Sequence, residues 1–187
     1  LSGGQPVSAA EWRARGQCHL QEQPGVAVEE LRQGQALGDR PSAELLPFAL
    51  AAAGEPEAAL LLWQQTPVAQ QSAAVRRAVV GAELAVGRVE QAEQHWQALP
   101  PSSVDDWRQG GHLAVARQDY PEAVRRWQRV LALGGALEDY YQAGMAAGSA
   151  GQREQQLAWL ERAAQLAPED PRIQADLGYA LANSLEP

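Results

Sequence analysis

The chain has 187 residues, of which 45% are hydrophobic, and a formal net charge of −8, so it is long enough to bury a core and too apolar for wholesale disorder. The negative charge, without any basic run, disfavours nucleic acid as a partner, and no apolar stretch approaches the ~20 residues of a membrane span, so no membrane contact by this chain itself is expected. Cys18 is the only cysteine, which excludes an intrachain disulfide and a cysteine-based zinc site.

The composition favours helices along the whole chain. Alanine, which has the highest helix propensity, supplies much of the apolar content, whereas β-branched and aromatic strand formers are sparse. Glycines and prolines such as Pro24-Gly25, Gly54 and Pro100-Pro101 separate the segments and mark their ends. The predicted helices are, in chain order, 8–21, 24–36, 41–53, 55–65, 68–86, 88–98, 103–117, 120–133, 137–150, 152–166 and 171–184.

A small residue followed four positions later by a large apolar one recurs along the chain. The copies are Ala27 with Leu31, Ala59 with Trp63, Ala92 with Trp96 and Ala123 with Trp127, and a fifth copy keeps Leu160 but replaces the alanine with Gln156. Successive large residues lie 32, 33, 31 and 33 positions apart, close to the ~34 of a tetratricopeptide repeat. Glycines in the first helix of a pair, such as Gly111, Gly144 and Gly178, match the same pattern.

These repeats predict an all-α fold, a tetratricopeptide-like right-handed superhelix of about five helix pairs plus one terminal helix. A short helix pair cannot bury its apolar face alone, so neighbouring pairs must stack. The expected organisation is a single solenoid over 1–187 with repeats near 8–36, 41–65, 68–98, 103–133 and 137–166 and a half repeat at 171–184. The missing initiator methionine, the abrupt ending and the unpaired last helix indicate a fragment of a longer protein.

The residue types that form catalytic and metal sites in other proteins are scattered along this sequence. His19, His95 and His112 fall in different repeats without metal-ligand spacing, and the sequence contains no phosphate-binding loop. We therefore predict no enzyme activity, no cofactor and no metal site. Trp63, Trp96 and Trp127 share one repeat position and are predicted to form core between repeats.

A binding surface remains as the candidate site. In tetratricopeptide superhelices the first helices line the concave side, where ligands usually bind. The repeat register places a mixed polar and aromatic stripe there, which suits a peptide or a carbohydrate; a solvated groove with no dedicated ligand is an equally open alternative. The predicted ligand-binding residues are Trp12, Phe48, Arg77, Arg108, His112, Tyr141, Met145 and Tyr179.

One stretch is more specific than the general repeat. The segment Ala10-Glu-Trp12-x5-Cys18-x5-Pro24-Gly-Val-Ala27 resembles the family of bacteriophage N4 adsorption protein A, and the resemblance continues through Asp119-Tyr120…Ala123 and Leu177-Gly-Tyr-Ala-Leu181. Members are large outer-membrane proteins of Gram-negative bacteria with a periplasmic tetratricopeptide region. They are similar to exopolysaccharide secretion proteins, and some serve as phage receptors.

The resemblance implies a non-catalytic scaffold on the periplasmic side of the outer membrane, within an exopolysaccharide secretion or phage-adsorption protein. Its partners would be proteins of the export or adsorption complex, with polysaccharide as a further possibility. Two alternatives stay open. One is a cytosolic tetratricopeptide adaptor that binds a partner peptide in its concave groove. The other is a carbohydrate-binding solenoid that stacks sugar rings on Trp12, Tyr141 and Tyr179.

Overall fold

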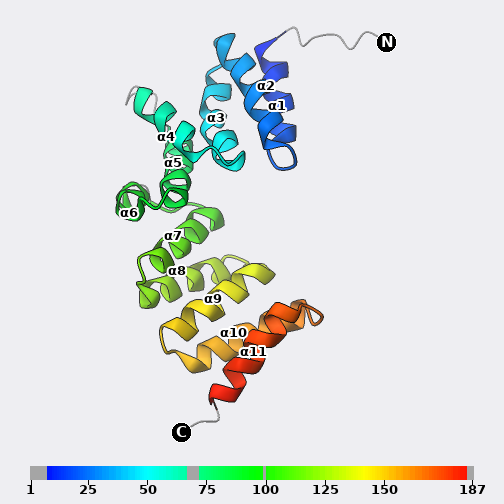
Figure 1. Cartoon of the computed structure of the whole chain (residues 1–187), viewed down its shortest axis with the longest axis vertical. Helices are drawn as coiled ribbons and strands as arrows, with labels where there is room; N and C mark the ends of the chain where they lie inside the picture. The colour runs from blue at the N-terminus through cyan, green and yellow to red at the C-terminus, as the bar shows by residue number, and fades with distance from the viewer. Residues whose placement is uncertain (1–7, 67–71, 99, 185–187) are drawn as a thin grey trace. The chain divides into compact units, whose positions relative to one another are not determined.

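The computed structural model describes residues 8–66, 72–98 and 100–184, and every regular element in these ranges is an α-helix (Figure 1). Each predicted helix is present, with ends that differ by a few residues from the predicted ones; positions 68–71 of the predicted 68–86 helix lie outside the described residues. The helices are α1 (Ala9–His19), α2 (Pro24–Ala36), α3 (Arg40–Ala52), α4 (Pro56–Gln65), α5 (Ala73–Ala85), α6 (Val89–Gln97), α7 (Val104–Ala116), α8 (Tyr120–Ala132), α9 (Leu137–Ser149), α10 (Arg153–Leu166) and α11 (Pro171–Ser184).

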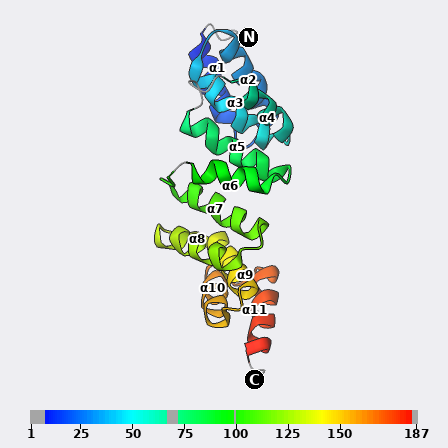
Figure 2. The same ribbon diagram turned by 90° about the vertical axis from the view of Figure 1, so that its left-hand side faces the viewer.

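The helices fall into two compact units, Leu1–Leu99 with α1 to α6 and Pro100–Pro187 with α7 to α11. Consecutive helices within each unit pack side by side, as two views at right angles show for α7 to α11 (Figures 1 and 2). We call the odd-numbered helices the first helices and the even-numbered ones the second helices of the pairs. The expectation of a single solenoid over 1–187 depends on how the two units are arranged, and it stays a prediction.

Polar side chains set the starts of several helices. The side chain of the residue before the helix accepts a hydrogen bond from a backbone N–H three positions on in six places: Ser8, Asp39, Ser72, Ser103, Asp119 and Asp170. Asp106 completes a capping box with Ser103.

The turn inside a pair has the same backbone conformation in four places. Gly54, Gly87 and Gly151 have φ angles of 80°, 77° and 72°, and Gln118 occupies the same turn position with a φ of 59°. In each turn the following residue donates its N–H to a carbonyl near the end of the first helix, which closes the last helical turn. A left-handed backbone suits glycine and costs other residues about 1–2 kcal/mol, so the Gln118 turn is the strained copy.

A first-helix glycine makes room for the large repeat residue in three pairs. The large residues Leu31, Trp127 and Leu160 belong to the predicted repeat, and their burial confirms that part of the register. A Cβ added to the glycine would lie 2.6–2.8 Å from a side-chain atom of the large residue, too close for two carbon atoms. The three pairs in contact are Gly16 with Leu31, Gly111 with Trp127, and Gly144 with Leu160.

The prediction that three tryptophans form core is confirmed for Trp127, which is fully buried. Trp63 packs against the core of the first unit but is only half-buried, and Trp96 is also half-buried. The position that holds Gly111 in α7, the eighth residue of the helix, holds Pro47 in α3 and Val80 in α5. Both side chains are buried and occupy space that the glycine leaves to the indole of Trp127.

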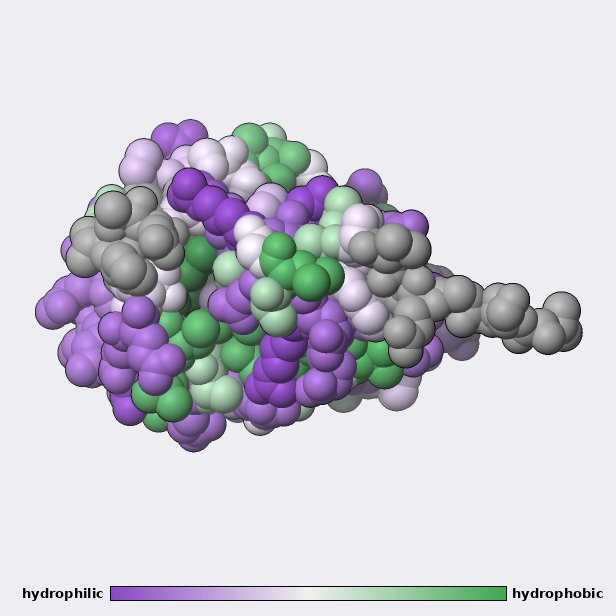
Figure 3. All heavy atoms as spheres, turned by 90° about the horizontal axis from the view of Figure 1, so that it is seen from above, coloured by the Kyte–Doolittle hydropathy of each residue, from purple (hydrophilic) through white to green (hydrophobic). Residues whose placement is uncertain are grey.

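The described surface mixes polar and apolar residues. Figure 3 shows one face on which hydrophilic side chains predominate and hydrophobic ones form small separate groups. In the described ranges no helix is both long enough and apolar enough to cross a membrane.

Candidate functional site

The predicted site residues all lie on first helices, three in the first unit and five in the second. Trp12 on α1, Phe48 on α3 and Arg77 on α5 are half-buried. The guanidinium carbon of Arg15 lies 5.8 Å from the centroid of the Trp12 ring, a distance at which a cation is attracted to an aromatic face. Trp12 therefore already has a cationic neighbour, Arg15, on its own helix α1.

In the second unit the five residues form two rows. Counting from the first residue of each helix, Arg108 and Tyr141 occupy the fifth position, and His112, Met145 and Tyr179 occupy the ninth. The two rows differ in what their side chains do: the fifth-position residues are bound to neighbouring helices, and the ninth-position residues reach solvent.

Arg108 joins α7 to α9. Its Nε and Nη2 donate to the two carboxylate oxygens of Asp139, each at 2.7 Å, and its Nη1 donates to Asp105 at 2.7 Å. These hydrogen bonds, first the one with Asp139 and then the one with Asp105, raise the pKa of Arg108. Burial acts to raise the pKa of Asp139, but hydrogen bonds from Arg108 and from the backbone N–H of Ala136 outweigh it, so this pKa is lowered.

Tyr141 joins α9 to α11. Its hydroxyl donates to Asp176 at 2.7 Å, and the guanidinium carbon of Arg172 lies over its ring, 4.2 Å from the centroid. Arg172 is itself paired with Glu138 at 2.9 Å. Burial and the contact with Asp176 raise the pKa of Tyr141. The expected use of Tyr141 as a platform for sugar rings disagrees with this geometry, because the side chain is buried and Arg172 covers a ring face.

The ninth-position row is exposed. Met145 keeps 38% and Tyr179 keeps 69% of its surface accessible, and His112 is also exposed. One edge of the His112 ring still packs against the indole of Trp127, with centroids 5.0 Å apart and planes at 88°. Desolvation lowers the pKa of His112, against the opposite influence of the Asp139 and Glu138 carboxylates, which favours the neutral imidazole at pH 7.

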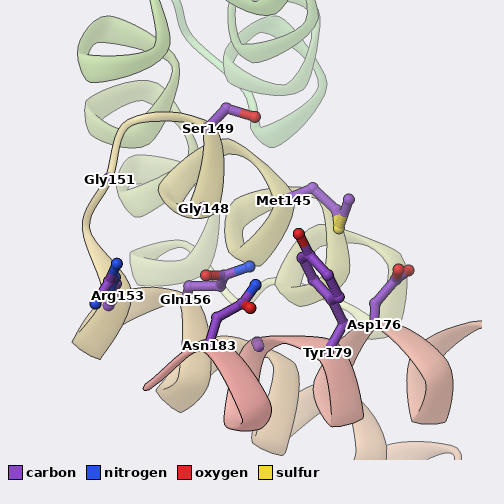
Figure 4. A pocket seen from close by; sticks show the side chains of 10 residues that line it. Met145, Gly148, Ser149, Gly151, Arg153, Gln156, Asp176, Tyr179 and Asn183 are labelled. Atoms are coloured by element: carbon purple, nitrogen blue, oxygen red, sulfur yellow. The ribbon is translucent and has the colours of Figure 1, made fainter. Parts of the chain in front are cut away.

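Met145 and Tyr179 line an open hollow of about 530 Å³ between α9, α10 and α11, which we call the α9–α11 hollow. In Figure 4 the ring of Tyr179 points from α11 towards Met145 on α9. Arg153 and Asp176 lie at opposite ends of the hollow. The lining residues are Met145, Gly148, Ser149, Gly151, Arg153, Gln156, Asp176, Tyr179, Ala180 and Asn183.

Sequence reasoning missed most polar residues of this hollow. Ser149 and Asn183 share the thirteenth position of their helices, so an extension of the repeat register would have found them. Arg153 is the first residue of a second helix, α10, and no first-helix pattern points to it. The other three predicted second-unit residues, Arg108, His112 and Tyr141, do not line the hollow.

Three or more metal-binding side chains do not come together anywhere in the described part of the chain. No family model matches the sequence, and no curated protein matches it.

Solved structures do resemble this fold. A chain of the APC/C hetero-tetramer Cut9-Hcn1 matches with a TM-score of 0.77 and 15% identity over 95% of this chain, which spans 37% of that chain. A thermophilic TPR protein from Thermus thermophilus matches with a TM-score of 0.72 and 18% identity over 94% of this chain and 100% of that one. A structure of kinesin-light-chain TPR-like repeats from Podosopora anserina matches with a TM-score of 0.67 and 20% identity, over 87% of this chain and 97% of that one.

At these identities the likeness concerns the fold. The chain has an all-α tetratricopeptide-repeat fold, and the fold class expected from the repeat spacing is confirmed.

Proposed function

We propose that this chain is a binding scaffold rather than an enzyme, and that the first-helix face of its second unit holds an extended segment of a partner protein. The observation that carries the proposal is the exposed row of His112, Met145 and Tyr179, which repeats once per helix pair beside a preformed hollow. Methionine and aromatic side chains are common at adaptable protein-binding surfaces.

The contacts beneath this row support the same conclusion. Arg108 with Asp139 ties α7 to α9, and Tyr141 with Asp176 ties α9 to α11. A face whose helices are already fixed loses little conformational entropy when a segment binds, and that favours affinity. The fold also supplies precedent, because the similar Cut9-Hcn1 chain was solved in a hetero-tetramer.

A displayed library of random peptides tests the proposal. Selected peptides should bind the chain, and Met145→Glu should weaken their binding about tenfold because it puts a charge into an apolar contact. The matched control is Leu133→Glu, since Leu133 is also an exposed apolar residue but follows the second helix α8. Equal binding to both variants, or a library that yields no binder, contradicts a protein-binding groove on this face.

The finer proposal is that the scaffold lies on the periplasmic side of a Gram-negative outer membrane, in an exopolysaccharide secretion or phage-adsorption protein, with proteins of that complex as partners. It is supported by the Trp12, Cys18 and Pro24 spacing, which resembles the bacteriophage N4 adsorption protein A family. The alternative is a cytosolic adaptor that uses the same groove.

Cys18 is exposed and is the only cysteine of the chain, so it reports on the compartment. Whole cells that make the natural protein are treated with a maleimide that crosses the outer but not the inner membrane. The periplasmic proposal predicts labelling that a Cys18→Ser variant loses. Labelling of Cys18 only after the inner membrane is broken favours the cytosolic adaptor and contradicts the periplasmic proposal.

A further inference from the structure

We propose that the α9–α11 hollow recognises an aromatic or long apolar side chain that stands next to a carboxylate in the bound segment. This inference rests on the proposed function, because it names the chemistry of the partner at one point of the groove. It follows from the apolar side chains, the unpaired donors and the charges that line the hollow.

The apolar part of the site is the space beside Met145 and Tyr179. The Tyr179 ring is mostly exposed and points towards Met145 (Figure 4). An incoming aromatic ring gains contact with a tyrosine face and with a polarisable sulfur, both of which favour aromatic neighbours. The volume of about 530 Å³ lies within the range of small-ligand sites, so it has room for a large side chain and part of the next residue.

The polar part of the site favours an anion. Arg153 is the only cationic residue that lines the hollow, and it has no ion-pair partner among the described residues. The side chains of Ser149 and Asn183 line the same hollow, and neither makes a hydrogen bond within the described ranges. A guanidinium and neutral donors around one space match the needs of a carboxylate.

The charge distribution sets the direction of the bound pair. Asp176, the only acidic residue among the described residues of the lining, already accepts a hydrogen bond from the hydroxyl of Tyr141 at 2.7 Å. It lies at the end of the hollow away from Arg153 (Figure 4). A carboxylate is therefore attracted to the Arg153 end, while the apolar side chain occupies the space beside Tyr179.

Capped, dye-labelled peptides test the idea by fluorescence anisotropy with the whole chain. The probe is Ser-Gly-Phe-Glu-Gly-Ser, and the matched peptides replace Glu with Gln or Phe with Ala. The Phe-Glu peptide should bind about tenfold more tightly than either matched peptide, the difference expected for one charged hydrogen bond or one buried ring. Added salt should reduce the Glu-over-Gln preference, since it screens an exposed charge pair.

Protein variants locate the contact. Arg153→Glu should remove the preference for Glu over Gln, and Tyr179→Ala should remove the preference for Phe over Ala. The controls are Arg129→Glu, an exposed arginine of α8 without an ion-pair partner in the described chain, and Leu181→Ala, an exposed apolar residue of α11. All four residues are exposed, and circular dichroism checks that each variant keeps its helices.

Further arms identify the source of the carboxylate. A peptide that ends in Phe with a free terminal carboxylate is compared with its amide, to test a chain end as the source instead of an acidic side chain. Tighter binding of the carboxylate form from either source, lost in Arg153→Glu, supports the inference. Equal binding of the Phe-Glu and Phe-Gln peptides overturns it, as does tighter binding of an acidic oligosaccharide than of any peptide. If library peptides bind the groove and their affinity is unchanged by Arg153→Glu, this inference fails while the proposed function stands.

Discussion

The carboxylate of Asp139 serves two helices at once. Both of its oxygens accept hydrogen bonds from Arg108 on α7, at 2.7 Å each, and Oδ2 also accepts the backbone N–H of Ala136 at the start of α9, at 2.8 Å. A buried carboxylate with three donors is stabilised in its charged form. This group therefore caps α9 and fixes the distance between the two first helices that carry His112 and Met145.

Asp139→Ala is expected to lower the free energy of unfolding by about 2–3 kcal/mol. The value is below that for a fully buried pair because the Arg108 side chain keeps 35% of its surface exposed. The control is Asp105→Ala: Asp105 binds the same guanidinium at 2.7 Å but is 84% exposed, so its loss should cost less than about 0.5 kcal/mol. Urea unfolding measures the free energy of unfolding of both variants. Equal decreases in this free energy contradict the role assigned to Asp139.

The same carboxylate predicts a dependence of stability on pH. The pKa of Asp139 in the folded chain lies below its ordinary value of 3.8, so its stabilising contribution is complete above that value and is lost as the pH falls through the folded pKa. The difference in unfolding free energy between the natural chain and Asp139→Asn should be constant from about pH 7 to 5 and shrink below about pH 4. A difference that grows on acidification contradicts this assignment.

The glycine at the eighth position of the first helices gives a matched pair of substitutions. Gly111→Ala puts a methyl group 2.6 Å from the Trp127 indole, so we expect a loss of about 1–3 kcal/mol. Gly178→Ala meets nothing within 4 Å and should instead stabilise α11, by up to about 1 kcal/mol, through helix propensity. Thermal unfolding followed by circular dichroism separates the two, and a shift of the same sign for both variants argues against this packing.

A single substitution in the turn at Gln118 is expected to stabilise the chain. Gln118 has a φ of 59°, whereas the corresponding turns contain Gly54, Gly87 and Gly151. Gln118→Gly should raise the free energy of unfolding by about 0.5–1 kcal/mol, because relief of the left-handed strain exceeds the extra entropy of glycine. Gly87→Ala is the reverse control and should destabilise. No gain at Gln118, measured by urea unfolding, means that the turn is not strained.

The sequence predicted the elements well because its periodic signals are local. Alanine with a large residue four positions on, as in Ala123 and Trp127, places a second helix, and the glycine turns place its start. The environment of each side chain was harder to predict, since it depends on residues about 31 to 35 positions away in the sequence. Arg108 was expected to be a groove cation and is bound to Asp139; Tyr141 was expected to be open and is bound to Asp176.

Half-burial of Trp63 and Trp96 has the same cause. The repeat position of a tryptophan is visible in the sequence, but the space available to it depends on the residue opposite, which is glycine in one pair and proline or valine in others. A residue on a second helix that reaches the groove, such as Arg153, needs the folded arrangement of three helices before it can be recognised.

The central claim, that the first-helix face of the second unit binds a protein segment, has a direct probe. Met145 is the only methionine in the chain, so labelling the methionine methyl group with ¹³C gives one NMR resonance that reports on the α9–α11 hollow. Titration with peptides selected on the chain should shift this resonance in a saturable way, and Tyr179→Ala should weaken the shift. Saturable peptide binding that leaves the Met145 resonance unmoved would contradict the account.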